Sequence, residues 1–405
     1  MNIVLFTHPS FMSSQSMPRF ARMLEQAYVT RGHQVKVWAP QAKLHKLIPV
    51  GRLSKWAGYV DQYLLFPIWV RKQVKLQPAD TLYVFCDQAL GPWVPLVNHK
   101  PHAVHVHDLL ALRSALDDVP ENPTGWSGKL YQRYIRRGFK QAKHFISISN
   151  RTREDLHRFG QVTPIISEVV YNGLNYPYAP MPKNQALTLL KQANLSVPSE
   201  GMLLHLGGSQ WYKNLAGVIR IYIEYAKTET KPSPLWCISP GPSAVLHTLL
   251  KQVPAHGHIK FIQGIDNQAL HAAYAVARVF IFPSLAEGFG WPIIEAQACG
   301  CPVITTNAAP MNEIGGSAAT YIPQLKTTDD AGAWSENAVQ TLRQLLAMPA
   351  SQKKTLVETG IANVVRFNVD GAIEGYLSVY QQVLTLSNTA STKNYPSILD
   401  QKATE

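Results

Sequence analysis

The sequence predicts an α/β protein of two doubly wound domains, each built on a parallel sheet. Three observations support this prediction: the length, the apolar content, and an alternation of strands and helices that restarts halfway along the chain. The chain has 405 residues, which suits two to three domains of about 150 residues each. Hydrophobic residues make up 46% and charged residues 16%. Apolar content this high fills large cores and excludes a disordered or collagen-like chain.

The first forty residues show the repeating unit. Residues 3–6 form a short apolar run of strand type, and Pro18 lies where a first helical turn begins. Apolar side chains then recur at the spacing of one helical face, and Gly32 is placed to end that helix. A second strand over 35–38 completes a βαβ unit, which favours a parallel sheet.

Further strands are expected in both halves of the chain. In the first half they lie at 81–86, 103–107, 144–148 and 168–171, with a helix over 127–142. In the second half they lie at 202–206, 235–239, 259–263, 278–283, 302–305 and 320–322. Helices over 214–226, 267–277 and 292–299 are expected between them.

A strand-free stretch at 176–199, rich in Pro, Asn and Lys, separates the two halves. We therefore expect one domain at 1–180 and a second at 181–368. A closing helix over 369–386 is expected to return to the first domain, and the polar tail 387–405 is expected to be disordered. Ligands of open parallel sheets bind at the carboxyl ends of the strands, so the two domains should face each other across a ligand-binding cleft.

The most informative stretch is a strand–loop–helix run. An apolar strand ends at Pro283, a loop with Gly288 and Gly290 follows, and Pro292 lies where a helix would make its first turn. Glycines let backbone N–H groups approach a ligand closely, and a helix N-terminus favours anions. The run therefore predicts an anion site.

Two carboxylates, Glu287 and Glu295, flank this anion site. Because carboxylates do not bind phosphate, their expected partners are hydroxyl groups. A ligand with phosphates in its middle and hydroxyls at both ends is a nucleotide-sugar. The plain alternative is that both glutamates are ordinary solvated side chains at a strand end and on a helix.

This stretch resembles the retaining glycosyltransferases of GT-B fold, in particular family 4. Glu287 and Glu295 match the E-x7-E signature of that family at full spacing, and the flanking segments 298–304 and 313–316 match as well. The resemblance is dense over 201–323 and thinner over the N-terminal half. It implies that Glu287 faces the hydroxyls of the donor sugar and that Glu295 accepts hydrogen bonds from the ribose. It also implies donor contacts from the backbone of the loop Gly288, Phe289 and Gly290. It further implies that the first domain, 1–180, is the acceptor side and that the second, 181–368, binds the nucleotide-sugar.

The resemblance extends to two further sites. Lys213 follows a strand and the pair Gly207 and Gly208, and it takes the position where the family holds a cation against the diphosphate. His107 ends a strand of the first domain, where the family often places a histidine by the donor sugar; the plain alternative is a satisfied buried histidine. The expected catalytic residues are therefore Glu287, His107 and Lys213, with Gly208 in the donor site.

The chain departs from the family pattern in two places. The loop after the first strand, residues 7–17, is often Gly-rich in the family and contacts the phosphates or the acceptor, and here it contains no glycine but four serines. The family usually has an arginine a few residues before the phosphate lysine, and here Ser209 and Gln210 occupy that region. Lys213 then acts without its usual partner, or a basic residue from elsewhere replaces it.

The sequence contains no D-x-D motif, which argues against a metal-bridged diphosphate and predicts an enzyme without a metal or other cofactor. GDP-mannose and UDP-hexoses both stay open as donors. The resemblance implies retention at the anomeric carbon, and we expect substitution on the front face, with the leaving phosphate helping to deprotonate the acceptor. The expected acceptor is a saccharide or a lipid-linked saccharide in cell-surface polysaccharide or lipopolysaccharide synthesis.

The net charge is +12, and the excess basic residues crowd two segments of the first domain. One spans 129–158, and the other spans 43–75 and mixes cations with Trp, Tyr and Phe. This mixture suits an anionic membrane surface, although a solvated basic face is equally open. No nucleic-acid motif accompanies the charge, so no nucleic-acid partner is expected. No apolar run approaches the roughly 20 residues that cross a bilayer, and four scattered Cys fit a reduced compartment. We expect a cytoplasmic protein, peripheral on the inner face of the membrane.

Two other classes stay open from the sequence. One is a GT-B enzyme that acts on a sugar-nucleotide alone, such as an epimerase or hydrolase. The other is a non-catalytic protein that keeps the fold and binds sugars or a membrane. A requirement for an added acceptor separates a transferase from the first class.

Overall fold

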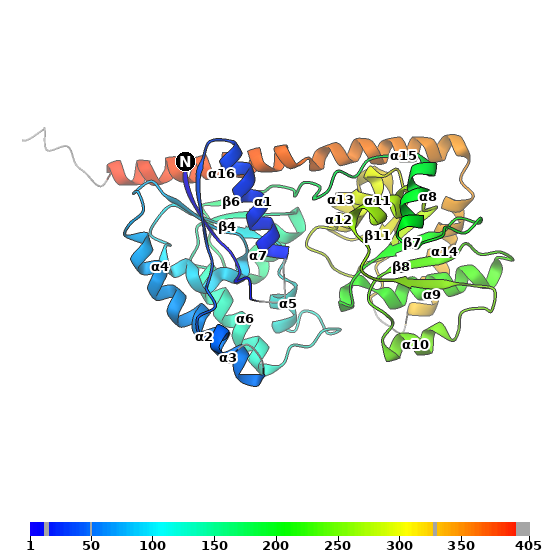
Figure 1. Cartoon of the computed structure of the whole chain (residues 1–405), viewed down its shortest axis with the longest axis horizontal. Helices are drawn as coiled ribbons and strands as arrows, with labels where there is room; N and C mark the ends of the chain where they lie inside the picture. The colour runs from blue at the N-terminus through cyan, green and yellow to red at the C-terminus, as the bar shows by residue number, and fades with distance from the viewer. Residues whose placement is uncertain (12–15, 49–50, 327–329, 394–405) are drawn as a thin grey trace, which may run out of the picture. The chain divides into compact units, whose positions relative to one another are not determined.

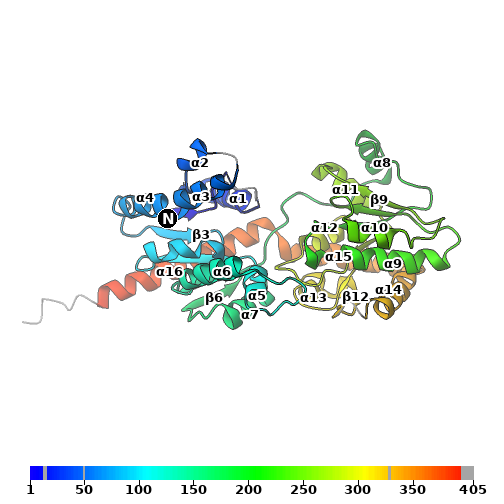
Figure 2. The ribbon, with the colours of Figure 1, turned by 90° about the horizontal axis from the view of Figure 1, so that it is seen from below.

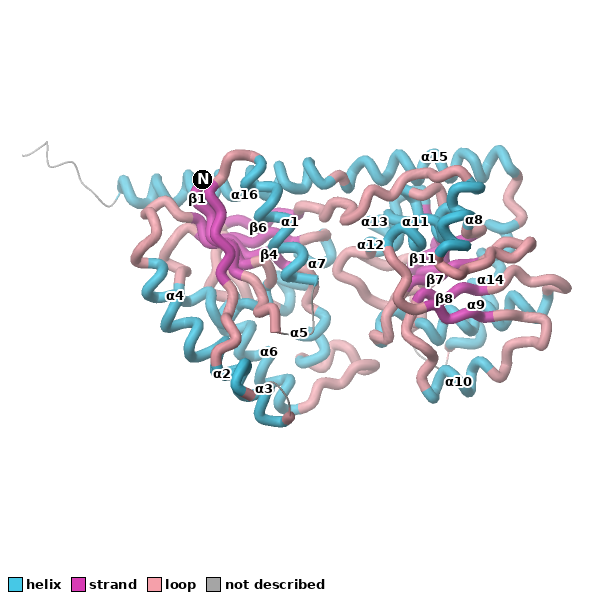
Figure 3. Tube along the Cα trace, in the orientation of Figure 1, coloured by secondary structure: helices cyan, strands magenta, loops and turns pink. Residues whose placement is uncertain are grey.

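The computed structural model describes residues 1–11, 16–48, 51–326 and 330–393. These residues form two compact units, each around its own sheet (Figure 3). Unit 1 comprises Met1–Val170 and the segment that begins at Asp370, and unit 2 comprises Tyr171–Val369. The chain thus first passes from unit 1 to unit 2 between residues 170 and 171. The sequence had predicted this domain boundary between residues 180 and 181.

Unit 1 contains a six-stranded sheet in the order β2-β1-β3-β4-β5-β6, and every strand pair in it is parallel. Its strands are β1 (Asn2–Phe6), β2 (Gln34–Trp38), β3 (Leu82–Phe85), β4 (His102–Val106), β5 (His144–Ser147) and β6 (Ile166–Val169). Its helices are α1 (Ser16–Thr30), α2 (Leu44–Leu47), α3 (Arg52–Val60), the π-helix η1 (Asp61–Leu65), α4 (Phe66–Val74), the 3-10 helix η2 (Gln88–Leu96), α5 (Leu110–Ala115), α6 (Trp126–Phe139), α7 (Asn150–Phe159) and α16 (Val369–Lys393).

Helices cover both faces of this sheet, which is why its strands read as nearly continuous apolar runs. On one face Val4 and Phe6 pack with Phe66 and Phe139, which come from α4 and α6. On the other face Ile3 and Leu5 pack against α1 and α16. Figure 1 shows α16 running along unit 1, and buried side chains join it to that core. They are Ala372, Ile373, Tyr376, Val379, Tyr380 and Val383.

Unit 2 contains a second six-stranded parallel sheet, in the order β12-β11-β10-β7-β8-β9. Its strands are β7 (Leu203–Leu206), β8 (Leu235–Ile238), β9 (Ile259–Ile262), β10 (Val279–Phe282), β11 (Val303–Thr306) and β12 (Ala319–Ile322). Its helices are α8 (Lys183–Gln192), the 3-10 helix η3 (Trp211–Lys213), α9 (Leu215–Thr228), α10 (Ala244–Leu250), α11 (Asn267–Val276), α12 (Trp291–Ala298), α13 (Met311–Gly315), the 3-10 helix η4 (Gly316–Ala318), α14 (Ala331–Leu346), α15 (Ala350–Val364) and the 3-10 helix η5 (Val365–Phe367).

The core of unit 2 packs α9 and α14 against the sheet. Tyr222 of α9 and Leu342 of α14 are fully buried there with Leu203 and Ile281. Figure 2 shows α11 and α12 away from α9 and α14. On that side Tyr274 of α11 meets Phe280 of β10 edge to face, with ring centroids 5.2 Å apart.

Each sheet has one point at which the strand order reverses. In unit 1 it lies between β1 and β3, because β2 lies on one side of β1 and the later strands on the other. In unit 2 it lies between β7 and β10 for the same reason. Such switch points leave a crevice at the carboxyl ends of the two flanking strands, where ligands of doubly wound proteins bind.

The sheets confirm the predicted α/β class, and each of the twelve expected strand segments overlaps an observed strand. The expected disorder from residue 387 onward is wrong for 387–393, where α16 continues to Lys393. No Gly or Pro interrupts this stretch, so a helix already formed extends with one hydrogen bond per residue. Residues 394–405 lie outside the described part of the chain. The stretch 176–199 holds a helix that the sequence did not predict, α8, which buries Ala186 and Leu190.

Candidate functional site

The candidate site lies in unit 2, at the switch point between β7 and β10. Lys213 closes η3, just after β7, and Glu287 lies in the loop after β10. Lys213 Nζ donates to Glu287 Oε1 over 2.8 Å, and the two side chains are 16% and 9% exposed. The strand ends on both sides of the switch point are therefore joined by an ion pair that is largely withdrawn from water.

Aromatic rings surround the Lys213 ammonium group. Lys213 Nζ lies 5.3 Å from the ring centroid of Tyr212 and 5.2 Å from that of Phe282. The negative faces of aromatic rings stabilise a cation at these distances. Lys213 is thus held as a positive charge at the strand ends. Among the described residues no other Lys or Arg forms an ion pair with Glu287 or Glu295.

Asn214 fixes the position of Lys213. It adopts the left-handed conformation, with φ +52°, and caps α9 by accepting a hydrogen bond from Gly217 N over 3.1 Å. Its Nδ2 donates to Pro283 O over 3.0 Å, at the end of β10. Leu285 N also donates to Tyr212 O over 2.7 Å. The loops after β7 and β10 therefore form one hydrogen-bonded assembly.

The glycine loop leads into the N-terminus of α12. Gly290 has φ +109°, a conformation that side chains rarely adopt, and it occupies the N-cap position of the helix. Pro292 lies in the first turn, as predicted. Phe289 is 3% exposed and packs edge to face against Trp291 and Phe367. Its ring thus belongs to the core, which leaves its backbone N–H as the group for a ligand.

Gly208 lies in the loop after β7. A Cβ built there would come within 2.2 Å of Gln210 Oε1, so a side chain at position 208 would displace Gln210. Because Gly208 precedes Lys213 in the same loop, its missing side chain keeps the backbone next to η3 accessible. A direct contact between Gly208 and the nucleotide-sugar stays a prediction.

Glu295 lies on α12 and is 5% exposed. Its Oε2 accepts a hydrogen bond from the Tyr274 hydroxyl over 3.1 Å. Burial raises the pKa of Glu295 to about 7, although the Tyr274 hydrogen bond and the Lys213 charge oppose this shift. The Lys213 ammonium group therefore acts on both carboxylates, and Glu295 changes its charge near neutral pH.

His107 belongs to unit 1 and follows β4. Its Nε2 donates to Cys86 O over 2.9 Å, and its ring meets Phe20 edge to face. Burial lowers the pKa of His107, and the charge of Asp87 partly opposes the shift. The ring is thus neutral and fixed at the carboxyl edge of the unit 1 sheet. Its predicted contact with the donor sugar stays a prediction.

Sequence reasoning missed three contributors to these sites. Tyr274 lies on the predicted helix over 267–277 but gives no motif signal, because an apolar helix face with a tyrosine is ordinary. Asn214 is adjacent to the predicted Lys213, and its left-handed backbone cannot be read from one residue type. Asp87 follows a predicted strand, which is the position that a search for polar residues after strands would find.

No group of three or more His, Cys, Asp or Glu side chains forms a metal-binding cluster in the described ranges, and metal independence stays a prediction. No helix over the same ranges is long and apolar enough to cross a membrane.

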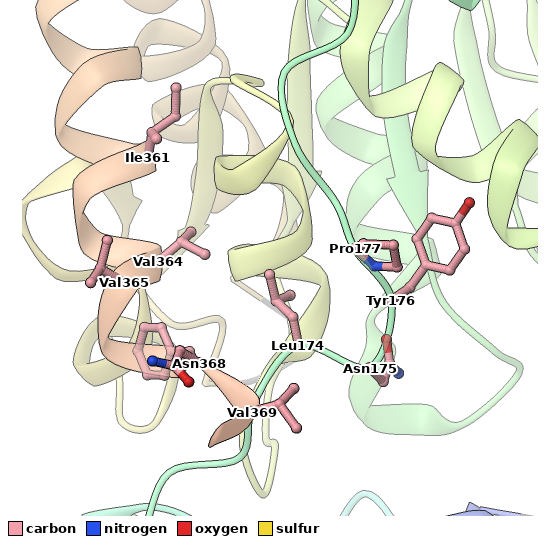
Figure 4. A pocket seen from close by; sticks show the side chains of 10 residues that line it. Leu174, Asn175, Tyr176, Pro177, Ile361, Val364, Val365, Asn368 and Val369 are labelled. Carbon is pink, nitrogen blue, oxygen red and sulfur yellow. The ribbon is translucent and has the colours of Figure 1, made fainter. Parts of the chain in front are cut away.

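A separate apolar pocket of about 560 Å³ lies elsewhere in unit 2 (Figure 4). It is lined by residues 174–177 of one segment and by residues 361, 364, 365 and 367–369 of another. Leu174 N donates to Phe367 O over 3.1 Å beside it, so the two segments are tied together. Its lining carries no charged side chain, which makes it unsuited to a diphosphate.

Comparisons with known proteins agree with the site. The family described as Glycosyltransferase Family 4 matches residues 17–176, and that described as Glycosyl transferases group 1 matches residues 188–327. The matches fall on both parallel sheets, and the second covers Lys213, Glu287 and Glu295. Fold and site thus define a GT-B glycosyltransferase.

More specifically, the chain belongs to the GT-B glycosyltransferases of family 4 type and is a transferase enzyme. It is 23% identical over 301 residues to O-antigen chain mannosyltransferase B of Escherichia coli, which covers 72% of this chain and 76% of that protein. It is 22% identical over 224 residues to O-antigen chain mannosyltransferase RfbU of Salmonella typhimurium, covering 55% of this chain. The match spans 58% of RfbU.

Among solved structures, the chain resembles WaaG, described as a glycosyltransferase involved in lipopolysaccharide biosynthesis. The TM-score is 0.67 with 15% identity, and the likeness covers 93% of this chain and 99% of that one. At this identity the likeness establishes the fold.

Proposed function

We propose that this enzyme is a retaining hexosyltransferase. It transfers a hexose from a nucleotide-sugar to a saccharide or lipid-linked saccharide in the synthesis of O-antigen or another cell-surface polysaccharide. GDP-mannose is the favoured donor, because both relatives reported above are named as mannosyltransferases; UDP-hexoses are the alternative.

The observation that carries this proposal is the Lys213–Glu287 ion pair at the switch point of unit 2. A diphosphate needs a fixed cation and backbone N–H donors, and a sugar needs acceptors for its hydroxyls. Lys213 supplies the cation, the N-terminus of α12 supplies the N–H groups, and Glu287 supplies the acceptor. The 2.8 Å contact means that the cation for the diphosphate lies next to the acceptor for the sugar hydroxyls.

Glu295 completes the donor site in this proposal. The ribose of a nucleotide carries two hydroxyls that donate to an ionised carboxylate. The Tyr274 hydroxyl occupies one oxygen of Glu295 and orients the group. The carboxylate is desolvated in the free enzyme, so ribose hydroxyls would restore hydrogen bonds that burial removed.

The transfer step follows from the charges of the site. The bond between the anomeric carbon and the phosphate oxygen breaks, and Lys213 stabilises the negative charge that develops on the leaving diphosphate. The acceptor oxygen bonds to the same face of the anomeric carbon, and its proton passes to the leaving phosphate. The positive side chain and amide dipoles would serve where other transferases use a metal ion.

A ligand panel tests the proposal. Thermal unfolding is measured with GDP, UDP and ADP and with their hexose conjugates, for the wild type, for Glu295→Ala and for the control Glu224→Ala, which changes a glutamate of α9 outside the site. One nucleotide should stabilise the wild type and the control but not Glu295→Ala. A panel without any stabilising nucleotide would refute the donor site.

Turnover separates the transferase from a sugar-nucleotide epimerase or hydrolase. With the stabilising donor, release of the nucleoside diphosphate should depend on an added saccharide. Proton NMR of the product should show the anomeric configuration of the donor. An inverted product would contradict retention, and acceptor-independent epimerisation would replace the proposed function.

We also propose that unit 1 docks on an anionic membrane. Helices α2, α3, η1 and α4 carry apolar side chains on their outer side, including Leu47, Leu53 and Trp56, which are 76%, 65% and 67% exposed. Leu64, Ile68 and Trp69 extend this surface, and Figures 1 and 2 both place α2 beside α3. The segment 43–75 contains six lysines and arginines with described side chains: Lys43, Lys46, Lys55, Arg71, Lys72 and Lys75.

Asp61 holds this surface together. Its buried carboxylate accepts hydrogen bonds from the backbone N–H groups of Lys43, Leu44 and His45 over 2.9–3.1 Å. The exposed apolar residues are therefore presented by a fixed scaffold. Apolar side chains with surrounding cations match the interface of a bilayer that contains anionic lipid.

Sedimentation with liposomes tests this docking. The protein should bind vesicles with 30% phosphatidylglycerol, should bind less at 0.5 M salt, and should lose binding in Leu53→Ser/Trp56→Ser. The control Val245→Ser changes a residue of unit 2 that is 79% exposed and should bind normally. Absence of binding at low salt would refute the proposal.

A further inference from the structure

The switch point of unit 1 carries its own pair of polar residues. His8 follows β1 and Asp87 follows β3, the two strands that flank the reversal of strand order. His8 Nε2 and Asp87 Oδ2 lie 2.9 Å apart, and the side chains are 21% and 13% exposed. The pair thus occupies, in unit 1, the place that Lys213 and Glu287 occupy in unit 2.

Asp87 is fixed by the fold. Its Oδ1 accepts a hydrogen bond from Ala89 N over 3.0 Å and so caps η2. Burial alone would raise the pKa of Asp87, but His8, His107 and the Ala89 N–H outweigh burial and hold it below its ordinary value. An ionised Asp87 accepts a hydrogen bond from His8 Nε2, which orients the imidazole and leaves Nδ1 as its second functional nitrogen.

His8 Nδ1 has no hydrogen-bond partner among the described residues. When Nε2 carries the ring proton, Nδ1 of the neutral ring is an acceptor. His8 therefore presents an oriented acceptor nitrogen beside a carboxylate.

This set of groups selects the class of ligand. The negative charge of the Asp87 carboxylate repels phosphate or another anion, whereas a neutral hydroxyl can donate a hydrogen bond to the imidazole. The carboxyl edge of the unit 1 sheet thus offers a hydrogen-bond acceptor to a hydroxyl-bearing saccharide, the second substrate that a transferase needs.

We propose that His8, held by Asp87, binds the saccharide acceptor by accepting a hydrogen bond from one of its hydroxyls at Nδ1. His8 touches the substrate, and Asp87 is a positioning residue that acts through His8. This assignment rests on the proposed transferase function and adds the residues that receive its acceptor.

Steady-state kinetics with methyl α-D-mannoside as the acceptor probe tests the assignment. The donor is the nucleotide-sugar that stabilises the wild type. His8→Ala should raise the KM for the mannoside about tenfold, and nucleotide affinity measured by calorimetry should stay within twofold. Asp87→Asn keeps the cap of η2, because Asn caps helices as well as Asp, and should raise the same KM less. The control His99→Ala changes an exposed histidine before β4 and should behave like the wild type.

Any of the following results would overturn the assignment of His8 to the acceptor. An unchanged mannoside KM in His8→Ala removes the contact. A loss of nucleotide affinity as large as that of Glu295→Ala would place His8 in the donor site instead. Failure of the wild type to use any mannoside, with nucleotide binding intact, would refute the saccharide class but not the donor site. If His8→Ala does not fold, His8→Phe keeps the bulk of the ring without its nitrogens and gives the same comparison.

Discussion

The two units place a charged pair at the same topological position, but the chemistry of the pairs differs. Lys213–Glu287 joins the ends of β7 and β10 in unit 2, and His8–Asp87 joins those of β1 and β3 in unit 1. The lysine of unit 2 can only donate hydrogen bonds, whereas the imidazole of unit 1 also offers an acceptor nitrogen when it is neutral. A cation suits a diphosphate, and an acceptor nitrogen suits a neutral hydroxyl.

The strand orders explain why both pairs exist. Each sheet starts with a central strand, extends to one side, and then returns to the other side of that first strand. At such a point the connections after the two flanking strands lead to opposite sides of the sheet, and ligands of doubly wound proteins bind there. The fold fixes where a ligand binds, and the residues directly after the strands decide which ligand it is.

The largest effect is expected from removing the cation of unit 2. Lys213→Ala should lower kcat by about 10²- to 10³-fold, because the leaving diphosphate loses its charged partner. Release of nucleoside diphosphate measures this rate. The control Lys227→Ala removes a lysine of α9 that is 53% exposed and paired with Glu224. A kcat for Lys213→Ala within threefold of the wild type would show that the two pairs do not differ in the way we infer.

Glu295 of unit 2 gives the next effect, and this effect depends on pH. Its pKa of about 7 lies above the ordinary 4.5, so the folded state retains a proton that the unfolded state has released. This stabilisation is complete below about pH 4.5 and is lost as the pH rises through 7. The shift corresponds to about 3 kcal/mol. Glu295→Gln should therefore be more stable than the wild type at pH 8 by up to about 3 kcal/mol in urea unfolding.

The same titration should appear in donor binding. The wild type should bind GDP-mannose more tightly at pH 8 than at pH 6, because the ionised carboxylate is the better acceptor for the ribose hydroxyls. The diphosphate of this donor is esterified at both ends and does not titrate in that range. Calorimetry should show this dependence in the wild type and not in Glu295→Gln. An identical pH profile in both proteins would contradict the assignment of Glu295.

A smaller effect is expected where α16 completes the core of unit 1. The Tyr380 hydroxyl lies 2.6 Å from His105 Nε2 and accepts from the Tyr28 hydroxyl over 3.1 Å. Tyr380→Phe leaves these buried groups unpaired and should destabilise unit 1 by about 2 kcal/mol. Hydrogen exchange should accelerate in β1 and β4 but not in unit 2. Tyr134→Phe, at an exposed position of α6, should have no effect.

How much of this was predictable differs between fold and site. The twelve strands were visible in the sequence because buried parallel strands are short apolar runs bounded by turn residues. Glu287 and Glu295 were predicted from a motif whose spacing is local, and Lys213 was predicted separately from its place after a strand and a glycine pair. The hydrogen bonds from Tyr274 to Glu295 and from Asn214 to Pro283 join residues 21 and 69 positions apart. No local pattern encodes such contacts.

His8 and Asp87 show the same limit more clearly. They lie 79 positions apart and meet because β1 and β3 are neighbours in the sheet. The sequence predicted both strands but not their order, and without the order the pair cannot be recognised. The end of α16 shows the opposite case. Composition suggested disorder at 387–393, and the continuing helix outweighed it there.

The smallest effect is expected at Asn214, which anchors the pair of unit 2. Asn214→Gly keeps the left-handed backbone without strain but removes the bonds to Gly217 N and Pro283 O. We expect a loss of about 1 kcal/mol in stability and a kcat several-fold lower, because Lys213 is less firmly placed. Asn194 is the matched control, since it also has a left-handed backbone, with φ +58°, and is exposed.

Asn194→Gly should leave stability and kcat nearly unchanged. Equal effects of the two substitutions would mean that the left-handed backbone, and not the side-chain bonds, determines the contribution of Asn214. The contrast with unit 1 explains the modest size of the expected effect. There Asp87 is both a member of the pair and the cap of η2, so one residue orients the site. In unit 2 the cap is adjacent to the pair, and its loss loosens Lys213 without removing the charge.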